Sequence, residues 1–86
     1  MLSVEQVEAA QRDAVCQRGP RKGRLKANCP PMGTLAAAYW QGVMIATNPF
    51  KVSIAQMIFF TPEQQWLFDL VKGETDKMVA KRRQAA

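Results

Sequence analysis

The fold of this 86-residue chain is decided by residues 34–49, which read TLAAAYWQGVMIATNP. Thr34 is a good helix N-cap and Asn48-Pro49 stops a helix, so this stretch predicts a helix over about 35–47. Apolar side chains surround its helical wheel almost completely, and a helix that is apolar on all sides is buried. Its uninterrupted apolar run of about thirteen residues is too short to cross a bilayer. We therefore expect a core helix and no membrane span.

Cap signals predict a further helix on each side of this core helix. Ser3 and Gln6 form a capping box for a first, amphipathic helix that should end near Gln17. Thr61, followed by a proline and an acid, predicts a last helix that runs toward Arg83. The apolar side of that last helix is expected to consist of Trp66, Leu67, Leu70, Val71 and Met78.

Residues 52–60 are ambiguous, because their cap residues favour a short helix while their apolar run also fits a buried strand. A chain of this length holds one domain, here residues 1–86. The predicted fold class is all-α: a small, irregular three- or four-helix domain around a buried central helix (about 35–47). A long basic, Pro/Gly-rich connection over residues 18–33 joins the first helix to the central one.

The net charge of +5 is distributed unevenly along the chain. Residues 14–62 contain no acid, and five of their six bases lie close together in the connection. These five are Arg18, Arg21, Lys22, Arg24 and Lys26. Such a cluster attracts nucleic acid backbone or an acidic protein surface, although the same charge on a solvated, flexible loop would only aid solubility. The cluster holds no aromatic residue, so it lacks the stacking groups that bind single strands. A rival basic site is the end of the last helix, Lys81-Arg82-Arg83.

Residue types exclude most enzyme chemistry. The chain has no histidine, which removes the commonest general base and metal ligand, and it has no glycine-rich phosphate loop. Cys16 and Cys29 alone do not form a structural zinc site. The N-terminus lacks a signal peptide pattern, so we expect a cytoplasmic protein with reduced cysteines, a disulfide around the basic loop being the less favoured alternative. The sequence predicts no enzyme, no cofactor, no metal and no small-molecule substrate.

Aromatic residues are more numerous than short helices can cover, so part of this set is expected at the surface as a protein interface. The candidates are Trp40, Phe50, Phe59, Phe60 and Trp66. A DNA-reading helix-turn-helix is not favoured: Ala38 and Gly42 have its spacing, but Asn48-Pro49 stands where its second helix should run.

Together these features predict a non-enzymatic, small, basic interaction protein that binds a polyanionic partner, nucleic acid or an acidic protein surface, through the basic loop. The alternative is a structural or inhibitory protein, in the compact, methionine-rich style of small phage-encoded proteins. Such a protein would dock on a partner or in a larger assembly through exposed apolar helices.

Overall fold

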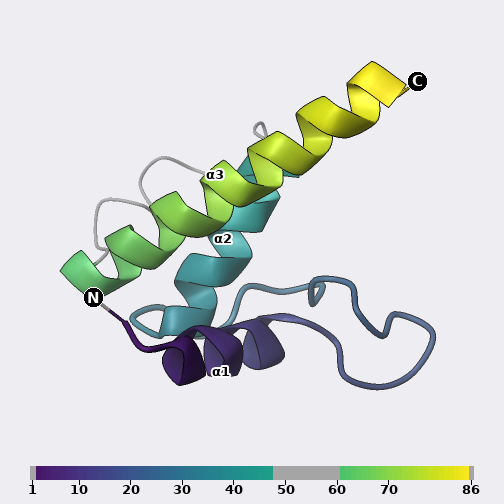
Figure 1. Ribbon diagram of the computed structural model, residues 1–86. Helices are drawn as coiled ribbons and strands as arrows, with labels where there is room; N and C mark the ends of the chain where they lie inside the picture. Colours follow the sequence, from purple (N-terminus) through teal and green to yellow (C-terminus); the bar gives the residue numbers. More distant parts are fainter. Residues whose placement is uncertain (1, 48–60, 86) are drawn as a thin grey trace.

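The computed structural model describes residues 2–47 and 61–85, and these residues fold into three helices. They are α1 (Val4–Ala14), α2 (Leu35–Thr47) and α3 (Pro62–Ala85), shown in Figure 1. The described part of the chain has no strand, so the prediction of a small, all-α single domain is confirmed. The ambiguous segment over 52–60 lies outside the described residues.

Each helix starts at its predicted cap. The Ser3 hydroxyl accepts a hydrogen bond from the Gln6 amide (3.2 Å), and the Gln6 side chain accepts one from the Ser3 amide (2.9 Å). The Thr34 hydroxyl accepts a hydrogen bond from the Ala37 amide, in the first turn of α2, at 3.2 Å. Thr61 and Gln64 exchange the same pair of bonds at the start of α3, at 3.2 and 3.0 Å. These bonds satisfy amides that have no partner within the helix.

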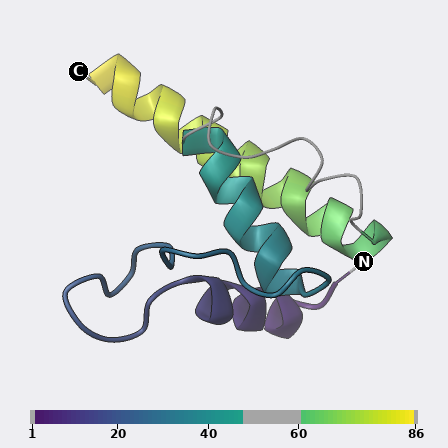
Figure 2. The ribbon, with the colours of Figure 1, turned by 180° about the vertical axis from the view of Figure 1, so that it is seen from behind.

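Helix α2 packs against both other helices, and Figures 1 and 2 show it crossing between α1 and α3. Its contact with α3 is close because Gly42 lies at the crossing. A Cβ atom at Gly42 would stand 3.1 Å from the Phe68 carbonyl oxygen and 3.3 Å from the Val71 Cβ. The core on this side comprises Leu2, Ala10, Ala38, Leu67, Phe68 and Val71.

The buried face of α3 differs from the predicted one. Leu67 and Val71 are buried as expected, but Leu70 is 41% exposed and Met78 is 56% exposed. Phe68 and Gln64 are buried instead. The expected apolar side of α3 is therefore only partly buried. Met78 lies in the second half of the helix, whose last turns project beyond α2 (Figure 1), whereas Leu70 lies in the first half at an exposed position. The helix continues through Gly73.

Helix α1 ends at Ala14, three residues before the predicted end near Gln17. The next residue, Val15, leaves the helix to form an antiparallel β-bridge with Leu25. The Gln17 side-chain amide then donates to two carbonyls at the end of the helix, each at 3.0 Å. Pairing with a residue ten positions ahead therefore decides where the helix stops.

Candidate polyanion-binding site

Residues 15–26 form an ordered loop closed by the Val15–Leu25 bridge, and we call it the basic hairpin. In Figure 1 it extends sideways from the end of α1. Its paired backbone explains why a segment rich in glycine and proline has a defined course. The closing hydrogen bonds run from the Lys26 amide to the Ala14 carbonyl (3.0 Å), from the Cys16 amide to the Arg24 carbonyl (2.8 Å) and from the Gly23 amide to the Cys16 carbonyl (2.9 Å).

Two glycines shape the tip of the basic hairpin. Gly19 and Gly23 have φ angles of 80° and 85°, a backbone conformation that other residues adopt only at a cost. Between them, the Lys22 amide donates to the Gly19 carbonyl at 3.1 Å and closes a turn. A second short-range bond, from the Arg24 amide to the Arg21 carbonyl at 2.9 Å, continues the turn.

The root of the basic hairpin is attached to the core. The Trp40 indole Nε1 donates a hydrogen bond to the Lys26 carbonyl at 2.8 Å. Leu25 is half-buried and packs on the cluster that contains Ala14 and Trp40. One hydrogen bond and one apolar side chain therefore join the hairpin to α2.

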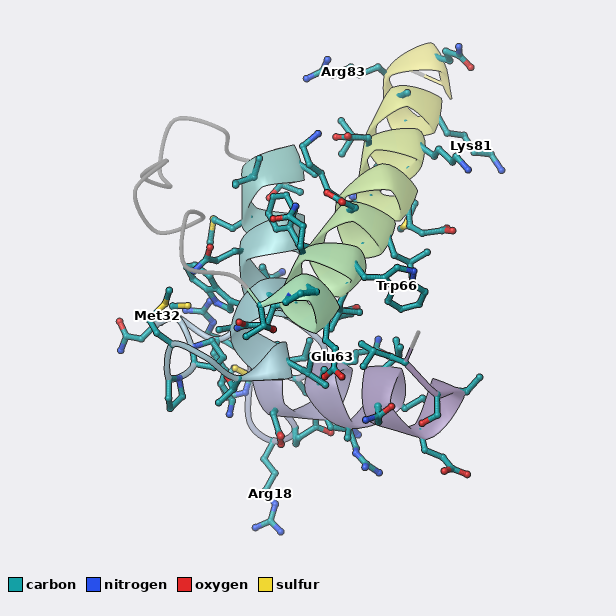
Figure 3. The ribbon with its side chains drawn as sticks, turned by 90° about the vertical axis from the view of Figure 1, so that its left-hand side faces the viewer. Arg18, Met32, Glu63, Trp66, Lys81 and Arg83 are labelled. Carbon is teal, nitrogen blue, oxygen red and sulfur yellow. The ribbon has the colours of Figure 1, made fainter. Side chains whose placement is uncertain are left out.

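The five predicted bases of the loop are all exposed. The Arg21 guanidinium donates a hydrogen bond to the Leu25 carbonyl at 3.0 Å. A carbonyl is neutral, so this bond does not compensate the positive charge of Arg21. In residues 2–47 and 61–85 the one ion pair joins Lys72 to Asp76 on α3 (2.8 Å), so the basic hairpin has no carboxylate partner there. Figure 3 shows Arg18 pointing away from the body of the molecule. Positive charges grouped on one hairpin, without carboxylates to neutralise them in the described residues, are the arrangement expected of a surface that attracts anions.

Two of the five predicted interface residues, Trp40 and Trp66, lie in the described part of the chain. Trp40 is only 9% exposed and belongs to the core that anchors the hairpin. Trp66 is half-buried beside Leu2 at the start of α3. Phe50, Phe59 and Phe60 lie outside the described residues.

Two basic residues that the loop prediction left out lie beside the basic hairpin. Arg12, on α1, lines a hollow together with Lys22. Arg82, from the rival basic cluster on α3, lines a pocket together with Leu25. Proximity between α3 and the hairpin depends on how α3 crosses α2, and no local sequence signal encodes that crossing.

A second polar feature lies between α2 and the connection that precedes it. Gln41 is fully buried, and its side-chain amide donates to the sulfurs of Cys29 (3.7 Å) and Met32 (3.5 Å). Its Oε1 atom has no hydrogen-bond partner. Cys16 and Cys29 are both free thiols. Within residues 2–47 and 61–85, no group of three His, Cys, Asp or Glu side chains could hold a metal ion.

No protein-family model, curated protein or solved structure matches this chain. None of the described helices is both long enough and apolar enough to cross a membrane. The nature of the partner therefore rests on the chemistry of the basic hairpin and its surroundings.

Proposed function

We propose that this protein is a non-enzymatic interaction protein whose basic hairpin binds a polyanionic partner. The observation that carries the proposal is the combination of five exposed bases, a defined hairpin backbone and no carboxylate partner in the described residues. Nucleic acid backbone and acidic protein surfaces are the two partner classes with the required charge.

Binding by such a site is mainly electrostatic. Each base that replaces a counterion on a polyanion adds affinity that falls as salt rises. The backbone bonds of the basic hairpin reduce the conformational entropy that binding would otherwise remove. An ordered scaffold with free charges therefore favours a binding surface over a loop that only aids solubility.

The alternative function is a structural or inhibitory protein that docks through apolar side chains and uses its bases only for steering. It is favoured by the exposed apolar residues of α3, Leu70 and Met78, and by Met32 before α2. Salt distinguishes the two functions, because phosphate contacts give a steep dependence of affinity on salt and an apolar interface gives little.

A binding titration against duplex DNA, single-stranded RNA and heparin at low salt tests the proposal. The informative variant replaces Arg18, Lys22 and Arg24 with glutamine and keeps Arg21, whose guanidinium bonds the hairpin backbone. It should lose most of its affinity for any polyanion that the wild type binds. Its free energy of unfolding should stay within about 0.5 kcal/mol of wild type, because all three side chains are exposed.

The matched control variant replaces Lys77, Lys81 and Arg83, which are exposed on α3, and so removes the same charge elsewhere. It should retain binding. A wild type that ignores all three ligands at low salt would refute the proposal and leave the docking alternative. Loss of binding in the α3 variant alone would move the site to the end of that helix.

A further inference from the structure

A pocket lies between the basic hairpin, α2 and the second half of α3, and its walls are mainly apolar. It has a volume of about 330 Å³. We call it the hairpin pocket; its lining includes Val15, Leu25, Tyr39, Val43, Met78 and Arg82. Met78 is 56% exposed and the other apolar members are half-buried, so the described residues leave these walls partly accessible.

Tyr39 contributes an aromatic wall that carries no charge. Burial raises the pKa of its phenol above the ordinary value, so the ring stays neutral at physiological pH. The opposite wall carries the flexible thioether of Met78, a side chain that adapts to irregular apolar partners.

The charges at the hairpin pocket and the hollow next to it are all positive. Arg82 lines the pocket, and Arg12 and Lys22 line the hollow, which shares Val15 with it. No carboxylate lines either one. Of the nearby acids on α3, Asp76 is paired with Lys72 at 2.8 Å. The hairpin pocket thus has one base in its own lining, Arg82 of α3, and the hollow next to it adds one base from α1 and one from the basic hairpin.

This combination fits an acidic protein segment better than nucleic acid. A duplex offers phosphates to the bases but no apolar group that would fill the pocket. Single-stranded bases stack on open aromatic faces, whereas the aromatic residue of this pocket, Tyr39, is half-buried. An acidic amphipathic helix supplies both an apolar side chain for the pocket and carboxylates for its rim. The volume lies near the lower limit of about 300 Å³ for ligand pockets, so it accommodates one or two side chains.

We propose that the hairpin pocket binds an apolar side chain of an acidic, amphipathic protein segment, whose carboxylates contact the basic hairpin and Arg82. This inference rests on the proposed polyanion-binding function and names the partner class of the same site. The pocket provides the selectivity, since the bases alone would accept any polyanion.

Titration with two synthetic peptides of equal negative charge tests the inference. One peptide is built of glutamate with leucines at helical spacing, and the other has serine in place of each leucine. Wild type should bind the leucine peptide about tenfold more tightly, a difference expected for burying one apolar side chain. Met78→Ser should remove this preference and leave heparin binding unchanged. Leu70→Ser is the matched control, because Leu70 is exposed on the same helix and does not line the pocket.

Equal affinity for the two peptides, or equal behaviour of Met78→Ser and Leu70→Ser, would overturn the pocket inference while polyanion binding stands. Tighter binding of duplex DNA than of the leucine peptide would overturn it in favour of nucleic acid. Absence of binding to heparin, DNA and both peptides at low salt would refute the proposed function itself. Thermal unfolding of each variant, monitored by circular dichroism, checks that both serine variants are folded.

Discussion

The contact between α2 and α3 and the attachment of the basic hairpin to α2 show two ways of joining parts of a small protein. The helices are close-packed at Gly42 and bury Leu67, Phe68 and Val71. The basic hairpin is held by backbone bonds and by the Trp40 indole, and all five of its bases are exposed. Under the proposed function, stability and binding depend on different residues, so a substitution should be able to change one property and leave the other unchanged.

The largest effect is expected at the helix contact. Leu67 is 0% exposed, so Leu67→Ala should lower the free energy of unfolding by about 2–5 kcal/mol through lost burial and a cavity. Leu70→Ala, at a position that is 41% exposed, should cost about 1 kcal/mol or less. Urea denaturation measures both. Similar losses at the two positions would mean that α3 does not bury the side that carries Leu67 and expose the side that carries Leu70.

Two glycines in helices test how close the helix contact is. Gly42→Ala should destabilise by about 1–3 kcal/mol, because the new Cβ would press on the Phe68 carbonyl oxygen at 3.1 Å. Gly73→Ala meets nothing within 4 Å and should stabilise by up to about 1 kcal/mol through helix propensity. Opposite shifts in melting temperature are the expected result. A stabilising Gly42→Ala would show that the helices are farther apart.

A smaller effect is expected at the hairpin anchor. Trp40→Phe keeps an aromatic ring but removes the indole donor to the Lys26 carbonyl, at a cost of about 1–1.5 kcal/mol. Amide hydrogen exchange should accelerate at Lys26 and Cys16 more than at the α2–α3 contact. Trp66→Phe, which changes the tryptophan beside Leu2, is the control and should leave those two amides protected. Unchanged exchange in Trp40→Phe would mean that the hairpin holds its shape without this anchor.

The predictions from sequence succeeded where structure depends on residues a few positions apart. The caps at Ser3, Thr34 and Thr61 place the helix starts, because cap chemistry acts within one turn. The end of α1 was misplaced because it depends on Val15 pairing with Leu25 across a turn. The wheel of α3 showed which residues are apolar but not how far α2 covers them.

The residues of the candidate site could be named only in part from the sequence, because sequence patterns again report only on residues a few positions apart. Clustering along the chain was sufficient to identify the five bases of the loop. Arg12 and Arg82 share pocket linings with the basic hairpin only in the folded chain, and nothing in their distance along the sequence indicated it. Trp40 was expected as an interface candidate, but it lies in the core. Its indole donates a hydrogen bond to the Lys26 carbonyl of the basic hairpin and so holds the ring inside the protein. A helical wheel cannot distinguish a tryptophan that lies at an exposed interface from one that lies in the core.

The most direct test of the central claim, that the basic hairpin carries the polyanion-binding charge, is the salt dependence of binding to duplex DNA. Log affinity is measured against log salt for wild type, for the hairpin variant at Arg18, Lys22 and Arg24, and for the α3 variant at Lys77, Lys81 and Arg83. Each lost phosphate contact makes the slope of log affinity against log salt shallower by about 0.9. Three lost contacts in the hairpin variant should therefore make that slope shallower by up to about 2.7. The α3 variant should keep the wild-type slope. Equal flattening in both variants would show that net charge, and not the basic hairpin, determines binding.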